Sequence, residues 1–97
     1  MSTQNNAPSH AIVTVVGSDQ VGIIAKVSSF FAERNINIED ISQTILSGNF
    51  IMMMMIDLSK SIIPLAELKQ ELTTLGEATN VSMSILHERV FSAMHRI

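Results

Sequence analysis

The sequence predicts a two-layer α+β domain, in which two helices cover one face of a four-stranded antiparallel sheet. The chain has 97 residues, a length that suits one small domain. Its hydrophobic periodicity switches between strand-like and helix-like in the order strand, helix, strand, strand, helix, strand. This order is the ferredoxin-like βαββαβ plan, in which crossover connections place both helices on the same face.

The first strand and the first helix are marked by a change of period. The strand is expected over residues 10–17, and both of its faces are apolar. The helix is expected from about Gln20 to Arg34, with Asn35 as a left-handed residue that ends it. Its apolar stripe is wide enough to pack on a sheet, and it consists of Ile23, Ile24, Val27, Phe30 and Phe31.

The second strand contains an irregularity. It starts at Ile36, and Ile38 keeps the even parity, whereas Ile41 and Ile45 are odd-numbered. A period-two pattern cannot change parity without an extra residue. We therefore expect a bulge or a bend at Glu39-Asp40.

The third strand is the apolar centre of the predicted sheet. A hairpin turn at residues 47–49 leads into residues 50–58, which include the methionine run Met52 to Met55. Both faces of this strand are apolar, so it should lie centrally and be covered on both sides. Two helices cover one face only, and we therefore predict a homodimer or higher homo-oligomer that covers the other face or joins sheet edges.

The second helix and the fourth strand complete the domain. Pro64 suits the first turn of a helix, where its missing N–H is no loss, and the pattern runs to about Thr79 before Asn80 ends it. Residues 81–87 then alternate strictly between apolar residues and serines. Residues 1–9 are expected to form a disordered polar tail, and residues 88–97 a short amphipathic helix or docking tail.

Composition excludes several classes of function. The chain carries a net charge of −3 and no cysteine. The acidic balance argues against direct binding of nucleic acid, and without cysteine there is no disulfide, thiolate metal site or cysteine nucleophile. No stretch approaches the ~20 apolar residues of a membrane helix. Since the first residues lack the features of a signal peptide, a cytoplasmic location is expected.

The junction between the first strand and the first helix is the candidate binding site. Gly17 is expected to permit a turn, and Asp19 to cap the helix. Gly22 is expected inside the first helical turn, where glycine costs up to ~1 kcal/mol relative to alanine. Close approach of a ligand or of another backbone would compensate for this cost. The N–H groups of a helix start also form a ready site for a carboxylate.

Each candidate residue also has a purely structural explanation, and both interpretations stay open. Asp19 can be only the helix cap, Gly22 can allow close packing on the second strand, and Asn37 can bond to neighbouring backbone. In the functional interpretation, the amides of Val21 and Gly22 hold the carboxylate of a small zwitterion. Asp19 or the Asn37 side chain then accepts its ammonium group.

These stretches resemble a known family. Residues 15–25, with the pattern Gly-x-Asp-x-x-Gly, and residues 35–41, with their Asn-Ile opening, resemble the ACT domain over roughly residues 10–87. More closely, the chain resembles small stand-alone ACT proteins of uncharacterised function, which are related to the two-domain glycine-cleavage repressor of bacteria. That closer resemblance rests on Asp40–Ile45, Asp57–Lys60 and Phe91–Ile97.

The resemblance implies a regulatory module that binds a small amino-acid-like ligand without catalysing a reaction or using a cofactor. Such domains usually pair, and with no enzyme domain attached the module would act on a separate, unknown protein. Many ACT loops have proline where Val21 stands here, which makes this turn less rigid. The family's ligand position, often at a subunit interface, corresponds to Asp19, Gln20, Val21, Gly22, Ile23, Asn37 and Ile38.

A ligand-free protein–protein interaction module is the alternative function. It would use the apolar sheet face together with residues 88–97 as an anchor on a partner. The same tail also fits a buried stripe or a dimer contact, through Val90, Phe91, Met94 and Ile97.

The remaining chemistry-bearing residues favour ordinary structural roles. His10, His87 and His95 could suggest a metal site, with Glu88 adjacent, but no short paired-ligand spacing is present. We therefore expect ordinary hydrogen bonds for the histidines and no metal. The methionine run is interpreted as core, and the carboxylates Glu39-Asp40 and Glu67 with Glu71 as solvated charges.

Overall fold

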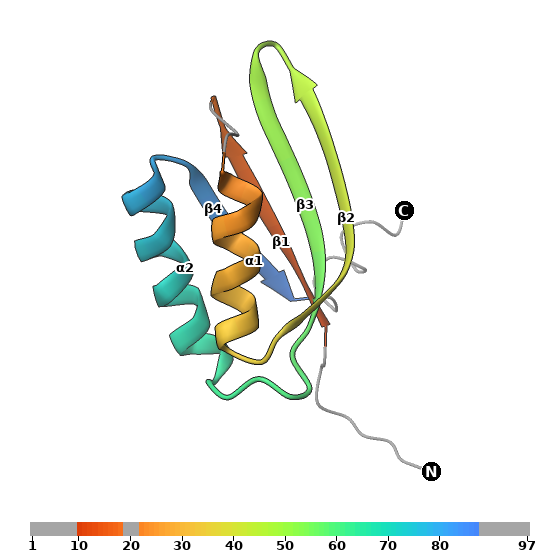
Figure 1. Cartoon of the computed structure of the whole chain (residues 1–97), viewed down its shortest axis with the longest axis vertical. Helices are drawn as coiled ribbons and strands as arrows, with labels where there is room; N and C mark the ends of the chain where they lie inside the picture. The colour runs from red at the N-terminus through yellow and green to blue at the C-terminus, as the bar shows by residue number, and fades with distance from the viewer. Residues whose placement is uncertain (1–9, 19–21, 88–97) are drawn as a thin grey trace.

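The computed structural model describes residues 10–18 and 22–87 of the chain. One antiparallel sheet with the strand order β2-β3-β1-β4 carries both helices on one face (Figure 1). The predicted ferredoxin-like fold is confirmed, and strand boundaries differ from the expected ones by no more than one residue. The elements are β1 (His10–Gly17), α1 (Ile23–Glu33), β2 (Asn37–Leu46), β3 (Asn49–Asp57), α2 (Leu65–Thr79) and β4 (Ser82–His87).

The hydrophobic core lies between the sheet and the two helices. Alternate residues of the central strands point into it, as the period-two pattern predicts. Of the predicted α1 stripe, Ile24 is the exception, because its side chain is 38% exposed. The most deeply buried core side chains are Val13, Val15, Val27, Phe31, Met52, Met54, Ile56, Leu68 and Leu72.

A β-bulge in β2 explains the change of parity in the sequence. The register of β2 on β3 shifts between Ile38 and Asp40, which leaves Glu39 as the extra residue. Ile38 pairs with Ile56, and beyond the shift Ile41 pairs with Met54. Directly paired residues of an antiparallel ladder share a face. The predicted bulge is therefore confirmed, and it keeps the isoleucines of β2 on the face that carries the helices.

The expected hairpin turn and the left-handed asparagines after both helices are also confirmed, whereas α1 starts at Ile23 and not at the expected Gln20. Ser47 and Gly48, with φ of 53° and 79°, form a two-residue hairpin loop, and positive φ at both positions is typical of a type I′ turn. Asn35 and Asn80 adopt left-handed conformations after α1 and α2, with φ of 61° and 62°. Asparagine tolerates this region better than most residues, which makes it a suitable helix terminator.

Gly17 has a different role from the predicted one. The positive-φ glycines of the described chain are Gly22 and Gly48, whereas Gly17 is the last residue of β1. A Cβ atom on Gly17 would lie 2.6 Å from Cγ1 of Val81. A Cβ atom on Gly76, inside α2, would lie 2.8 Å from the carbonyl oxygen of Val81. Both glycines therefore make room for the chain where it enters β4.

An ion pair ties the end of α1 to α2, and it corrects the expectation that Glu71 is merely solvated. Arg34 Nε donates to Glu71 Oε1 at 2.6 Å, and both side chains are partly buried. The Arg34 guanidinium also donates to the carbonyl oxygen of Phe30 at 2.8 Å and lies 3.7 Å from the centre of the Phe30 ring. A cation over an aromatic face adds to the attraction between the charges.

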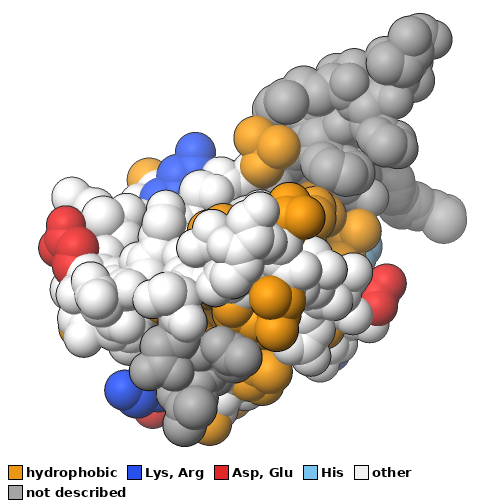
Figure 2. Space-filling view, turned by 90° about the horizontal axis from the view of Figure 1, so that it is seen from above, with side chains coloured by type: hydrophobic (Ala, Val, Ile, Leu, Met, Phe, Trp, Pro, Cys, Tyr) orange, Lys and Arg blue, Asp and Glu red, His pale blue; other side chains and the backbone are white. Residues whose placement is uncertain are grey.

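The face of the sheet opposite the helices has an apolar centre. By register, this face carries Ile12, Met53 and Met55 in neighbouring positions of β1 and β3, and Met53 is 38% exposed. The edge strand β2 is exposed along most of its length, and Ile45 near its end is 63% exposed. In the end-on view, hydrophobic patches lie between charged side chains at the margins (Figure 2). The predicted cover by a second copy remains a prediction.

The close approach at Gly76 gives the first test. Glycine to alanine inside a helix normally stabilises by up to ~1 kcal/mol. In Gly76→Ala the new methyl group meets the backbone oxygen of Val81, so we expect a loss of about 1–3 kcal/mol in urea unfolding. The exposed neighbour variant Glu77→Ala should stay within about 0.5 kcal/mol of wild type. If Gly76→Ala is as stable as wild type, the backbone at Val81 moves aside without lowering the free energy of unfolding.

Candidate functional site

The start of α1 is the described part of the predicted ligand loop, since Asp19, Gln20 and Val21 lie outside the described residues. Gly22 is the N-cap of α1, with φ of 77° and ψ of −6°. A Cβ atom built on Gly22 would meet nothing within 4 Å. The expectations that Gly22 lies inside the helix and that it allows close packing on the second strand are therefore wrong. The left-handed backbone conformation explains the glycine.

Ile23 serves the core through its side chain, which is 4% exposed. What it can offer a ligand is its backbone N–H, one of the first amides of a helix, which have no partner within the helix itself. The carbonyl oxygen of Gly22 accepts the first helical bond, from the N–H of Lys26 at 3.1 Å. This end of the helix therefore presents N–H groups with the positive end of the helix dipole behind them.

Asn37 and Ile38 lie at the opposite end of α1. Figure 1 shows that α1 starts near the end of the molecule that holds the β2–β3 turn and finishes beside the start of β2. The helix has 11 residues, so its ends are ~16 Å apart at 1.5 Å per residue. One chain therefore cannot hold a small ligand between Gly22 and Asn37. Ile38 is half-buried against the core, whereas Asn37 is exposed.

Asn37 borders a hollow of about 350 Å³. This volume is within the range of small-molecule sites. The amide of Asn35 shapes one side of it by donating to the carbonyl oxygen of Lys60 at 3.0 Å. The lining residues are Ala32, Asn35, Ile36, Asn37, Asp57, Ser59 and Lys60.

Asp57 is the charged acceptor of this hollow. Its Oδ1 accepts the backbone N–H of Ser59 at 2.9 Å, and this bond is the main reason why the pKa of Asp57 is lowered from its ordinary value. The Ser59 hydroxyl lowers that pKa further, burial opposes the shift, and the charges of His10 and Lys60 contribute less. Asp57 was not among the predicted site residues. The β2–β3 register, which pairs it with Asn37, could have found it.

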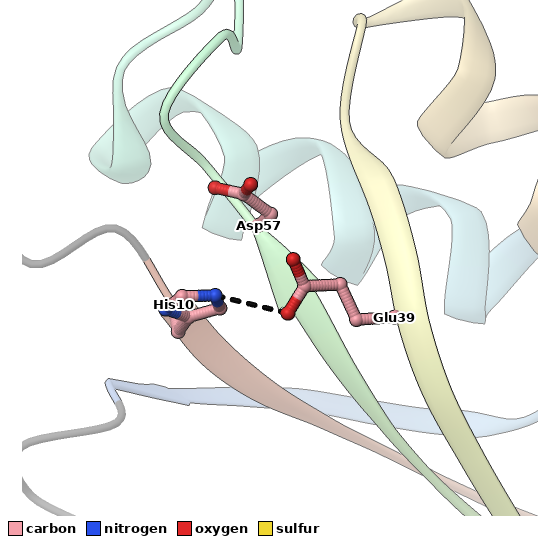
Figure 3. Close-up of side chains that lie close together, drawn as sticks. All are labelled: His10, Glu39 and Asp57. Carbon is pink, nitrogen blue, oxygen red and sulfur yellow. Dashed lines mark ion pairs between the residues drawn. The ribbon is translucent and has the colours of Figure 1, made fainter.

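His10 lies beside two carboxylates on the face opposite the helices. Its Nε2 is 3.0 Å from Glu39 Oε1, and Asp57 lies next to both (Figure 3). The register places His87 opposite Ala11, one residue from His10. The expected neighbourhood of these two strands is thus confirmed, while His95 and Glu88 lie outside the described residues. Glu39, expected to be solvated, instead reaches across the sheet to His10.

The sequence matches an established family. The family profile of the ACT domain matches residues 9–86. A UPF0237 protein of Listeria innocua is 51% identical over 87 residues, covering 90% of this chain and 98% of its own length. A UPF0237 protein of Methanopyrus kandleri is 48% identical over 87 residues, covering 90% and 97%.

Solved structures agree with this match. An ACT domain protein from Streptococcus pneumoniae is 39% identical with a TM-score of 0.78, over 88% of this chain and 96% of that one. A putative glycine cleavage system transcriptional repressor shares the fold, with a TM-score of 0.70 at 23% identity, over 88% of this chain and 50% of that one. Within the described part of the chain, neither helix has the length and apolar character to cross a membrane.

The conformation of Gly22 gives a second test. Alanine in the left-handed region costs about 1–2 kcal/mol, whereas asparagine tolerates it better. We therefore expect Gly22→Ala to lower the free energy of unfolding by that amount and Gly22→Asn to lower it less. Crowding does not confuse the comparison, because the built Cβ atom has open space around it. Equal losses in the two variants, measured by urea unfolding, would contradict this explanation.

Proposed function

Because the chain belongs to the ACT-domain family, we propose that it is a regulatory module that binds a small amino-acid-like ligand and acts on a separate protein. The observation that carries this proposal is the start of α1, where Gly22 is the N-cap residue and has a left-handed backbone conformation. Among the described residues, no atom lies within 4 Å of the position that its Cβ would take. The first amides of a helix are well suited to the carboxylate of an amino acid.

The proposed site is built from two copies of the chain. One copy supplies Asp19, Gln20, Val21, Gly22 and Ile23, and the other supplies Asn37 and Ile38. The length of α1 supports this arrangement, because it keeps the two groups of residues ~16 Å apart within one chain. The chain is accordingly proposed to work as a homodimer or higher homo-oligomer.

Hydrogen-bond acceptors near Asn37 suit the ammonium group of an amino acid. The Asn37 side-chain oxygen accepts hydrogen bonds, as an ammonium group requires. Asp57 pairs with Asn37 across the β2–β3 ladder and carries a lowered pKa, which favours the carboxylate form. The hollow that both residues line offers room for a small side chain. The carboxylate would lie against the amides of the other copy.

Exposed apolar residues on the β2–β3 hairpin favour the second candidate, a ligand-free interaction module. The hairpin extends past the helices (Figure 1), and Ile45 and Leu46 are each 63% exposed. An edge strand with such side chains is prone to pair with another chain. The same feature supports self-association in the first proposal, and only the response to ligand separates the two functions.

The ligand proposal is tested by a thermal-shift screen of the twenty amino acids at millimolar concentration. A ligand at 100 times its dissociation constant stabilises the folded protein by about 2.7 kcal/mol, so at least one amino acid should raise the melting temperature. Asp19→Ala and Asn37→Ala should each abolish the shift, while the exposed β2 variant Gln43→Ala should keep it. No shift with any amino acid would favour the ligand-free module.

Mixing the two inactive variants tests whether the site is shared. Random exchange makes about half of the dimers mixed, and each mixed dimer of a two-fold pair regains one intact site of two. The mixture of Asp19→Ala and Asn37→Ala chains should therefore recover about a quarter of the wild-type binding capacity. A mixture as inactive as its components would contradict a site built from two copies.

Self-association itself gives a further prediction. Sedimentation at micromolar concentration should show a dimer or a larger assembly, because Met53 on the sheet face and Ile45 and Leu46 of β2 are otherwise exposed to water. Met53→Lys, on the open face, and Ile45→Lys, on the edge strand, distinguish which surface is used. Ile62→Lys, at an exposed loop position, is the matched control and should leave the assembly unchanged. A monomeric wild-type chain would contradict the prediction.

A further inference from the structure

The ladder register and the β2 bulge bring three metal-ligating side chains together from three strands. His10 at the start of β1 pairs directly with Asp57 at the end of β3. Glu39 is the extra residue of the bulge, and its side chain extends from β2 over β3 toward His10 (Figure 3). Bulges commonly re-aim a side chain in this way beside functional sites.

The geometry of the cluster suits a single cation. One ligand atom each from His10, Glu39 and Asp57 can be chosen so that all lie within 4.8 Å of one another. The closest pair, His10 Nε2 and Glu39 Oε1, is separated by 3.0 Å. Ligand atoms bound at about 2.0–2.2 Å to one ion lie about 3–3.5 Å apart. A small inward movement of Asp57 therefore completes three positions of a coordination sphere.

We propose that His10, Glu39 and Asp57 bind a divalent transition-metal ion of the Zn²⁺ type. Two carboxylates and a neutral imidazole carry a charge of −2 together, which a divalent cation balances. An imidazole donor favours Zn²⁺ and its neighbours in the first transition row, whereas Mg²⁺ prefers oxygen ligands alone. The side chains of His10 and Glu39 are 30% and 38% exposed, so water can fill the remaining positions.

A neighbouring contact holds one ligand in place. The backbone N–H of Ser59 donates to Oδ1 of Asp57. Hydrogen bonds of this kind fix the orientation of metal-binding carboxylates. The proposal shares Asp57 with the Asn37 side of the proposed ligand site. Its test uses the metal ion alone, without any amino acid, so the two proposals fail separately.

The test is titration calorimetry of the untagged, chelator-treated chain with Zn²⁺. We expect one ion per chain, with Mg²⁺ binding far more weakly. Glu39→Gln and Asp57→Asn should each weaken Zn²⁺ binding by more than about 100-fold, beyond what loss of an outer hydrogen-bond partner costs. Asp40→Asn is the matched control, because it removes the adjacent carboxylate of β2, which lies outside the cluster, and it should bind as wild type does.

A spectroscopic measurement guards against binding elsewhere on the chain. Co²⁺ in place of Zn²⁺ should give visible absorption bands in wild type and in Asp40→Asn, and these bands should be lost in Glu39→Gln. Circular dichroism checks that the variants are folded. The proposal is overturned if wild type binds no Zn²⁺ at micromolar concentration. It is equally overturned if folded Glu39→Gln and Asp57→Asn both retain wild-type affinity, which would place the ion at other histidines.

Discussion

The antiparallel pairing of β1 with β3 is the contact on which the rest of the molecule depends. These two strands form the centre of the sheet, and the buried half of each supplies the floor on which both helices pack. Because every pair in the ladder is fixed by this register, it also decides which side chains meet at the two ends of the strands. His10 faces Asp57 at one end, and Gly17 faces Phe50 at the other.

The bulge in β2 adapts an edge strand to this centre. Without the extra residue, either Ile38 or the later isoleucines of the strand would turn away from the helices. With it, Ile38 and Ile41 both share the face of Ile56 and Met54. Glu39, the unpaired residue of the bulge, places its carboxylate on the opposite face, beside His10. A single irregularity thus satisfies the hydrophobic layer and creates polar chemistry on the opposite surface.

Much of this architecture could be predicted because its causes are local. The alternation of β4, the parity slip before Ile41 and the asparagines that end both helices are each visible within a few residues. The role of Gly17 could not be predicted, because it depends on Val81, which is distant in the sequence. Glu71 was misjudged for the same reason, since its partner Arg34 lies on the other helix. The proposed ligand residues stay a prediction, and they flank α1 in the chain, at its start and just after its end. The length of the predicted helix already implied that one chain holds these two groups far apart.

The separation of the two ends of α1 has a thermodynamic consequence. A ligand that touches the start of the helix in one molecule and the first residues of β2 in another is a shared bond between them. By mass action, its apparent affinity then rises with protein concentration, and its presence in turn strengthens the pair. The amount of ligand-bound dimer would then depend both on the concentration of the ligand and on the concentration of the protein itself.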